Sequence, residues 1–205
     1  MEKFLYIIRH GQTDLNSRGI VQGRGIDAPL NPVGLSQAQA FYEAYKSIPF
    51  DRVYTSRLLR TYQTVEPFIQ AGIPHEPLVG FDEISWGIYE GKEQTPDIIS
   101  GFEALVTQWK NGELHVAVEN GESPMQLIER QKVAMEYILS KEQEKNVLIC
   151  MHGRAMRILL CWLTGKDPAL MDTFPHTNTA LYKLHYHSGT HEIIDAYNIT
   201  HLNGL

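Results

Sequence analysis

The chain of 205 residues has little cysteine and no long apolar run. Its two cysteines, Cys150 and Cys161, lie in apolar segments, so we expect buried, reduced thiols rather than a disulfide, as is usual in the cytoplasm. No stretch approaches the roughly 20 apolar residues of a membrane span, and the N-terminus lacks the basic start and cleavage site of a signal peptide. These absences predict a cytoplasmic protein that does not enter a membrane.

Runs of basic residues and metal-ligand spacings are missing as well. The formal net charge is -6 and no basic stripe carries interleaved aromatics, which disfavours nucleic-acid binding. Cys150 and His152 lack further ligands at a recognised zinc spacing, and we expect neither a metal ion nor an organic cofactor. An acidic chain that gathers arginines and histidines in a few segments fits a small anionic substrate. Nothing in the sequence indicates an oligomeric state.

Strand-like runs alternate with helical patterns along the chain. We expect strands at residues 3–8, 52–55, 147–151, 179–185 and 192–197. Helices are predicted over 32–47, from 56 to before 72, from 124 after the capping residue Ser123, and from 153 to about 164. This alternation is typical of a mostly parallel sheet covered on both faces, and the length fits one domain over residues 1–205.

Two stretches do not follow the alternation. Residues 12–30 are rich in Gly, Asn, Asp and Arg without periodicity, and loops of that length in a compact domain are usually functional. Residues 81–122 combine turn-like dipeptides with a helical patch near 98–109. We predict that 81–122 forms a helical and loop subdomain that covers the active site at the carboxyl edge of the sheet.

A histidine and an arginine end the first predicted strand. Arg9-His10-Gly11 directly follows an apolar run, and the carboxyl ends of strands are where open α/β sheets bind ligands. Arginine is a permanently charged fork for phosphate oxygens, whereas neutral imidazole is a nitrogen nucleophile near neutral pH. The pair therefore suggests phosphoryl transfer through a phosphohistidine.

Other sheet-edge segments offer complementary groups. Arg57 and Arg60 follow the second strand, and His152 follows the strand at 147–151. A transferring phosphoryl group requires preorganised cationic donors, which Arg9, Arg60 and His152 could supply. Glu83, in a segment with aromatic neighbours, is our candidate acid for the leaving oxygen.

Each residue also has a purely structural interpretation. His10 could simply be held by a backbone carbonyl, Arg60 could form a surface salt bridge, His152 could help to cap a helix and Glu83 could be solvated. Taken singly, these interpretations are at least as good as the catalytic ones. Their joint occurrence at the expected ends of elements favours a shared site.

The residues resemble the histidine phosphatase superfamily, also called the phosphoglycerate mutase-like family. The resemblance covers most of the chain in the right order, through Arg9-His10-Gly11-Gln12-Thr13 with Asn16, 22–24, 27–30, 34–38, 56–64, 83–91, 121–123 and 147–153. It implies a three-layer α/β/α domain with a mainly parallel sheet and one antiparallel edge strand. It also implies a phosphatase-type enzyme that needs no cofactor.

The resemblance assigns a role to each matching residue. It makes His10 the phosphorylated nucleophile, Arg9, Arg60 and His152 the phosphate pocket, and Glu83 the proton donor and then the base for water. Substrate contacts are implied for Asn16, Gln22, Gly23 and Arg24. Arg154 departs from the small or apolar residue common in the family, and this extra cation would favour a substrate with a second anionic group.

Three different functions are compatible with these residues. We favour hydrolysis of a small phosphorylated metabolite, because family mutases carry an added segment and tail over the site, whereas this chain is compact and ends at Leu205 soon after its last strand. A bisphosphoglycerate-dependent phosphoglycerate mutase is the leading alternative. A catalytically inactive module that binds a phosphorylated ligand is the second, although a mere binder would not need an acid as well as a nucleophile.

Overall fold

One six-stranded sheet organises the chain. The computed structural model describes residues 2–205. Its strands are β1 (Glu2–Arg9), β2 (Arg52–Thr55), β3 (His75–Pro77), β4 (Asn146–Met151), β5 (Leu181–His187) and β6 (Thr190–Asn198). Its α-helices are α1 (Asp14–Ser17), α2 (Pro32–Tyr45), α3 (Leu59–Gln70), α4 (Pro96–Lys110), α5 (Pro124–Ser140) and α6 (Gly153–Leu163), with short 3-10 helices at Val79–Phe81, Gly87–Tyr89, Pro168–Thr173 and Thr200–Leu202.

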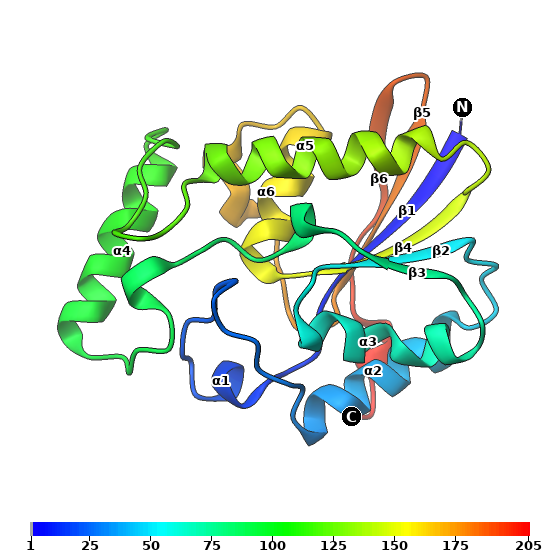
Figure 1. The fold of residues 1–205 in the computed structure, drawn as a ribbon, viewed down its shortest axis with the longest axis horizontal. Coiled ribbons are helices and arrows are strands. Elements are labelled where there is room, and N and C mark those ends of the chain that lie inside the picture. The colour runs from blue at the N-terminus through cyan, green and yellow to red at the C-terminus, as the bar shows by residue number, and fades with distance from the viewer. Residues whose placement is uncertain (1) are drawn as a thin grey trace.

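The strand order is β3-β2-β4-β1-β5-β6 (Figure 1). Strands β3, β2, β4 and β1 pair in parallel, whereas β5 runs antiparallel to both β1 and β6. The predicted α/β fold with a mainly parallel sheet and antiparallel pairing at one edge is therefore confirmed. Because β2, β4 and β1 are parallel neighbours, their carboxyl ends lie side by side, which places the segments after Thr55, Met151 and Arg9 together.

Side chains that alternate along β1 contribute to two hydrophobic cores, one on each face of the sheet. Leu5 and Ile7 belong to the core that includes α5 and α6, whereas Tyr6 and Ile8 belong to the core under α2 and α3. Side chains of a strand alternate between the two faces, so a single apolar run serves both layers. Helices α5 and α6 accordingly lie on one side of the sheet and α2 and α3 on the other, giving the three layers (Figure 1).

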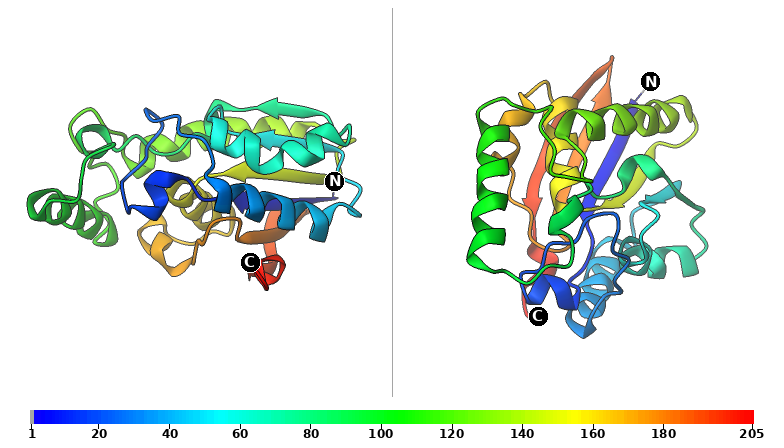
Figure 2. Two further views of the ribbon diagram at one scale, coloured as in Figure 1. Left: turned by 90° about the horizontal axis from the view of Figure 1, so that it is seen from below. Right: turned by 60° about the vertical axis from the view of Figure 1, so that its left-hand side comes forward.

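Residues 81–122 contain α4, which stands apart from the three layers (Figure 2). Its N-terminus is encoded locally, because the Thr95 hydroxyl accepts a hydrogen bond from the Ile98 amide and Pro96 begins the helix. The helix lies at the end of the molecule toward which β1 and β4 run (Figure 2). It is held by a small core in which Trp86 contacts Phe102 and Trp109.

Some element boundaries differ from those expected. Helix α3 begins at Leu59 and not at Ser56, because the Ser56 hydroxyl accepts a hydrogen bond from the Leu58 amide and keeps this segment out of the helix. The short strand β3 has no clear sequence signal, because it spans only His75–Pro77 at the sheet edge. The long segment 12–30 contains the one-turn helix α1 with a capping box between Thr13 and Asn16.

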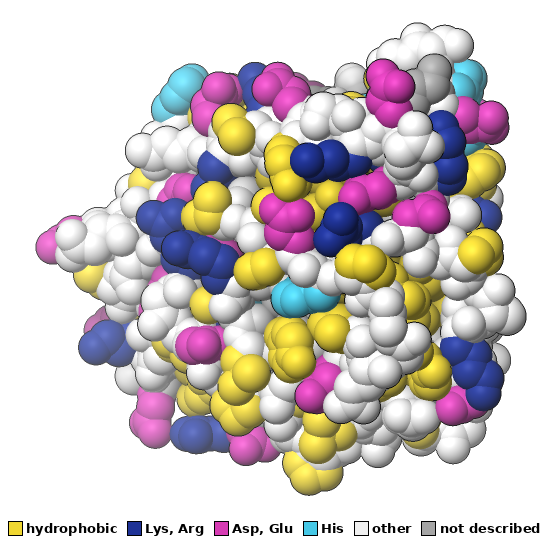
Figure 3. Space-filling model, turned by 45° about the vertical axis from the view of Figure 1, so that its right-hand side comes forward, with side chains coloured by type: hydrophobic (Ala, Val, Ile, Leu, Met, Phe, Trp, Pro, Cys, Tyr) yellow, Lys and Arg dark blue, Asp and Glu magenta, His cyan; other side chains and the backbone are white. Residues whose placement is uncertain are grey.

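The surface carries charges of both signs. On the face shown in Figure 3, acidic and basic side chains are interspersed, with apolar side chains between them. Over residues 2–205, no helix combines the length and the hydropathy that a bilayer-spanning segment needs.

Two glycines allow the loop after β1 to pack tightly on α2. A Cβ on Gly11 would lie 2.7 Å from the Gly34 carbonyl oxygen, and a Cβ on Gly34 would lie 2.8 Å from the Gln12 nitrogen. Real Cβ contacts are longer, so side chains at these positions would displace the backbone that carries His10.

We therefore expect Gly34→Ala to lower the free energy of unfolding by about 1–3 kcal/mol, the usual cost of overpacking. Because the displaced backbone at Gln12 closely follows His10, catalytic turnover should also fall. Denaturant unfolding and steady-state kinetics measure the two effects. Ser36→Ala, an exposed change on the same helix, is the matched control and should change little. Wild-type stability and turnover in Gly34→Ala would contradict this packing argument.

Candidate active site

Two histidines meet at the carboxyl ends of β1 and β4. His10 directly follows β1 and His152 directly follows β4, and these strands are paired in register from Phe4 with Asn146 to Arg9 with Met151. The ring centroids of His10 and His152 lie 5.1 Å apart. Residues separated by about two thirds of the chain are thereby placed in one site by the parallel pairing alone.

His10 is a buried, neutral imidazole with one nitrogen held by the backbone. Its Nδ1 lies 2.7 Å from the Gly11 carbonyl oxygen, which accepts only, so we assign the ring proton to Nδ1. This leaves Nε2 as the unprotonated nitrogen. Burial, then the charges of Arg60 and Arg9, hold the pKa of His10 well below its ordinary value. The imidazole is therefore nucleophilic without a separate base at neutral pH.

Arg60 lies fully buried beside the histidines. Its Nε donates to Nδ1 of His152 at 3.2 Å and its Nη1 donates to the Ile26 carbonyl at 2.7 Å. Because guanidinium only donates, His152 carries its proton on Nε2, which lies 2.8 Å from the Ser56 hydroxyl. Burial, followed by the Arg60 charge, lowers the pKa of His152 well below its usual value. Arg60 thus remains a buried cation with no carboxylate among these partners.

Among the described residues, Arg9 forms side-chain hydrogen bonds through Nη1 only. Its Nη1 donates to the His176 carbonyl at 2.6 Å and lies 3.2 Å from His176 Nδ1. Its Nε is buried without a hydrogen-bond partner among the described residues. A Cβ on Gly153 would lie 3.3 Å from this Nε, so the glycine leaves room for the guanidinium. Burial is the main cause that lowers the pKa of Arg9 to about 10, and the group stays charged at neutral pH.

Glu83 lies at the N-terminus of α6. Its Oε1 accepts hydrogen bonds from the backbone amides of Ile84 and Ala155, and its Oε2 accepts one from the amide of Arg154. A carboxylate suits this place, because the first amides of a helix lack partners within the helix and carry partial positive charge. The side chain is only 6% exposed, so these bonds fix the carboxyl group firmly.

A cavity of about 250 Å³ opens onto these groups. This is slightly smaller than the roughly 300–1,000 Å³ of pockets for drug-sized ligands, so the space suits a small molecule. Arg60 and His152 are fully buried and are not among the residues that line the cavity, but the His152 ring packs beside His10 and Arg60 donates to His152. The cavity is lined by Arg9, His10, Asn16, Gly19, Ile20, Val21, Gln22, Glu83, Trp86, Phe102, Gly153, Arg154, Arg157 and His176.

Of the predicted substrate-binding residues, Asn16, Gln22 and Arg154 reach this cavity. The Oδ1 of Asn16 accepts a hydrogen bond from the Thr13 amide, which leaves its Nδ2 to face a ligand. Gln22 donates to the Thr13 hydroxyl at 2.7 Å, and its Oε1 is buried without a partner in the described chain. These amides offer donors and an acceptor beside the two arginines.

Gly23 and Arg24 lie elsewhere. The Gly23 carbonyl accepts a hydrogen bond from Nη2 of Arg60 at 3.3 Å, which makes Gly23 a support for that arginine. Arg24 lines a separate hollow with Ser85 and Asn120, and its guanidinium is 3.6 Å from a carboxylate oxygen of Glu122. The structure therefore does not bring Arg24 to the cavity at His10.

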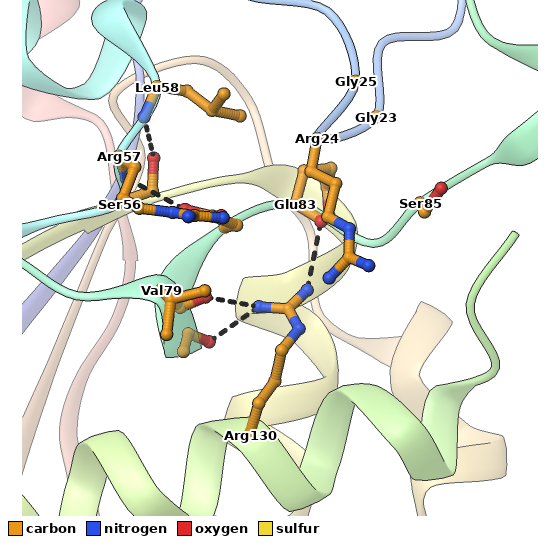
Figure 4. Close-up of polar contacts among 12 residues, drawn as sticks. Gly23, Arg24, Gly25, Ser56, Arg57, Leu58, Val79, Glu83, Ser85 and Arg130 are labelled. Carbon is orange, nitrogen blue, oxygen red and sulfur yellow. Dashed lines mark hydrogen bonds and ion pairs between the residues drawn. The ribbon is translucent and has the colours of Figure 1, made fainter.

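Arg130 supports the backbone at Glu83. Its guanidinium donates to the carbonyls of Val79, Gly80 and Glu83 at 3.0 Å each, and Arg24 lies next to it (Figure 4). It also pairs with Glu122 at 2.8 Å. Arg130 therefore fixes the turn that carries Glu83, a function with no signal in the sequence.

Arg157, His176 and Trp86 are among the lining residues that the sequence patterns did not assign to the site. Arg157 lies three residues after Arg154 on α6, so helical spacing alone could have indicated it. His176 follows no motif and is brought in by its contact with Arg9. Trp86 lies close to Glu83 in the sequence, and only the structure places its ring on the cavity wall. Among residues 2–205, no group of three or more His, Cys, Asp or Glu side chains could hold a metal ion.

A family model of the histidine phosphatase superfamily (branch 1) matches residues 5–200. The chain belongs to this superfamily. Relatives include the "Uncharacterized phosphatase PhoE" of Bacillus subtilis, 31% identical over 97% of this chain and 96% of that protein. The "Putative phosphoserine phosphatase 2" of Hydrogenobacter thermophilus is 29% identical over 80% of this chain and 79% of that protein.

Other similar proteins carry a mutase name or show the fold. A "Probable phosphoglycerate mutase GpmB" of Proteus mirabilis is 29% identical over 78% of this chain and 74% of that protein. The solved structure of Bacillus stearothermophilus YhfR superposes with a TM-score of 0.85 at 24% identity, covering 98% of this chain and 99% of that one. Family and relatives together support a phosphatase that acts on a phosphorylated metabolite.

In this histidine phosphatase, we expect both site histidines to be neutral at pH 6.5. Their pKa values are lowered by burial and by Arg60, so the imidazolium form is disfavoured in the folded enzyme. NMR of ¹⁵N-labelled histidine should show Nδ1 protonated in His10 and Nε2 protonated in His152. Because the unfolded chain binds these protons near pH 6.5 and the folded enzyme does not, stability should fall as the pH drops below that value. A His10 ring that titrates at or above pH 6.5 would contradict this assignment.

Proposed function

We propose that this enzyme hydrolyses phosphomonoesters of small metabolites through a phosphohistidine at His10. The observation that carries the proposal is the arrangement of His10, whose Nδ1 is held by the Gly11 carbonyl while its neutral ring lies beside the fully buried Arg60 and the partly buried Arg9. In the first step Nε2 forms a bond to phosphorus and the bond from phosphorus to the ester oxygen breaks. The covalent intermediate divides one difficult displacement into two easier ones.

The charges of Arg9 and Arg60 support the transfer. A phosphoryl group in transfer spreads negative charge over three equatorial oxygens. Arg9 presents a buried Nε without a protein partner, and the second guanidinium is held between carbonyls and His152. His152 supports the site next to His10 as a neutral ring. Fixed donors of this kind stabilise the transition state without reorganisation.

We assign the proton transfers to Glu83. The monoanion of the substrate phosphate passes its proton to the Glu83 carboxylate on binding, and the resulting carboxyl group gives this proton to the leaving ester oxygen. The resulting carboxylate then takes a proton from water as the water oxygen attacks phosphorus and the bond to Nε2 of His10 breaks. Glu83 is thereby protonated again and the free imidazole is restored. Its place on the cavity wall beside His10, and its fixed position at the start of α6, support this assignment.

The remaining assignments concern the substrate and the surroundings. We propose Asn16, Gln22 and Arg154 as substrate contacts, because all three line the cavity. We propose that residues 81–122 cover the site, since Trp86 and Phe102 from this segment form part of the cavity wall. Location in the cytoplasm stays a prediction, which the two free, buried cysteines support.

Replacing the nucleophile tests the phosphohistidine route. We expect His10→Ala to lose hydrolysis of p-nitrophenyl phosphate by several orders of magnitude, as enzymes do when a covalent nucleophile is removed. The wild-type enzyme, quenched rapidly at high pH, should contain phosphate bound to His10, detected by mass spectrometry. Active enzyme without this intermediate would refute the route. Absence of turnover by wild type with every phosphorylated metabolite tested would favour the inactive binding module.

Replacing Glu83 separates acid catalysis from binding. We expect Glu83→Gln to lower kcat by about 10²–10⁴-fold with an alkyl phosphate, the usual range for general acid catalysis. With p-nitrophenyl phosphate the loss in the phosphorylation step should be much smaller, because p-nitrophenolate leaves without a proton. Burst kinetics measure that step, and thermal unfolding of the variant controls for its fold. Equal losses of the phosphorylation rate with both substrates would contradict the acid role.

Product analysis distinguishes hydrolysis from mutase activity. Incubation with 3-phosphoglycerate should release inorganic phosphate and form no 2-phosphoglycerate. Formation of 2-phosphoglycerate without phosphate release, on addition of catalytic bisphosphoglycerate, would instead establish the mutase alternative, which the resemblance to GpmB keeps open.

A further inference from the structure

A second pair of arginines, besides Arg9 and Arg60, lines the cavity. Arg154 and Arg157 lie on the first two turns of α6, and each is less than 10% exposed. Both donate through Nη1 to Oδ1 of Asp172, the first at 2.8 Å. Two buried guanidinium groups therefore share one carboxylate oxygen, which leaves the pair with excess positive charge.

The geometry of Arg154 leaves one edge of its guanidinium without an acceptor. Nη1 is bonded to Asp172, whereas Nε is buried without a partner among residues 2–205. The ring of Trp86 lies 5.6 Å and that of Trp109 lies 5.7 Å from the guanidinium carbon. Aromatic contacts on this group fix its plane, and the edge formed by Nε and Nη2 is one that carboxylates bind through two parallel hydrogen bonds.

The balance of charges around the cavity indicates how much negative charge a bound substrate has to supply. Four arginines, Arg9, Arg60, Arg154 and Arg157, lie at or beside the cavity, whereas the carboxylates on its wall or hydrogen-bonded to these arginines are those of Glu83 and Asp172. If Glu83 is protonated when substrate binds, as the proposed function requires, one carboxylate remains. A dianionic phosphoryl group at His10 then still leaves one positive charge unbalanced in a buried place. Such a charge is costly unless it is paired.

We propose that Arg154 and Arg157 form a subsite for a carboxylate on the substrate, so that the preferred substrates are small phosphorylated carboxylic acids. The inference rests on the proposed phosphatase function and adds the substrate class. The phosphoryl group binds at Arg9 and His10, the carboxylate binds at the open edge of Arg154, and the apolar wall at Trp86 and Phe102 covers the carbon skeleton between them. The cavity of about 250 Å³ limits that skeleton to a few carbons.

A pair of substrates that differ in one group tests this subsite. 3-Phosphoglycerate and glycerol 3-phosphate are alike except that a carboxylate replaces a hydroxymethyl group. We expect kcat/KM of the wild type to favour 3-phosphoglycerate by about tenfold to a hundredfold, as for a charge-assisted hydrogen-bonded pair. Fructose 1,6-bisphosphate and fructose 6-phosphate form the comparison pair for a second phosphate. A preference for the bisphosphate without one for the carboxylate would overturn the proposed class.

Substitutions at Arg154 test whether this residue causes the preference for 3-phosphoglycerate. Arg154→Met should abolish the preference for 3-phosphoglycerate, and Arg154→Lys should retain part of it, because an ammonium group keeps the charge but loses the planar fork. Arg52→Met is the matched control, since Arg52 is also paired with a carboxylate, that of Glu144, but lies outside the cavity. It should keep the wild-type ratio. An unchanged ratio in a folded Arg154→Met enzyme would overturn the proposal.

The proposed phosphatase function and the carboxylate subsite can be disproved separately. If p-nitrophenyl phosphate is not hydrolysed by the wild type, or is hydrolysed equally well by His10→Ala, the proposed function fails. If it is hydrolysed through His10 but 3-phosphoglycerate and glycerol 3-phosphate have equal kcat/KM, only the carboxylate subsite fails. The wild-type ratio decides this even if Arg154→Met does not fold.

Discussion

Burial of positive charge at the carboxyl edge of the sheet is the constraint on which the site depends. Arg60 is fully buried, yet it is paired with carbonyl oxygens and an imidazole rather than with a carboxylate. Such an arrangement costs free energy in the empty protein, because charge is removed from water without full compensation. A bound anion would offset this cost. Burial, followed by the charge of Arg60, also holds the pKa values of His10 and His152 well below their ordinary value.

The fold holds these charges through backbone groups. Parallel pairing of β1 with β4 brings the two histidines together, and carbonyls of the segment 23–26 hold Arg60 in place. Glu83 joins another part of the chain to the first turn of α6, and Arg130 binds the carbonyls around it. Because these contacts are made to main-chain atoms, they depend on the path of the backbone. They depend less on which side chains the neighbouring residues carry. The candidate catalytic groups are thus positioned by rigid elements, as precise catalysis requires.

Local sequence patterns predict those parts of the site that lie at the ends of regular elements. The strand that ends at Arg9, the cap at Ser123 and the histidine after β4 follow from apolar periodicity and capping chemistry, and the structure has these elements. The same patterns predict the substrate side of the site less well. Arg24 is adjacent in sequence to Gln22, but its guanidinium is turned to Glu122, whereas Arg157 and His176 reach the cavity from distant elements. Loop conformations depend on long-range contacts that no local pattern encodes.

The sequence by itself determined most of the strands and helices and their succession, though not β3 or α1, together with the family and the positions of the histidine and arginines that follow strand ends. It did so because periodicity, capping and strand ends are local properties of the chain. Only the tertiary structure decided which nitrogen of each imidazole is free, which arginines share the cavity, and that Arg154 and Arg157 share a single carboxylate. These features depend on distances between groups far apart in the chain, and electrostatic interactions respond to distance and burial rather than to sequence separation.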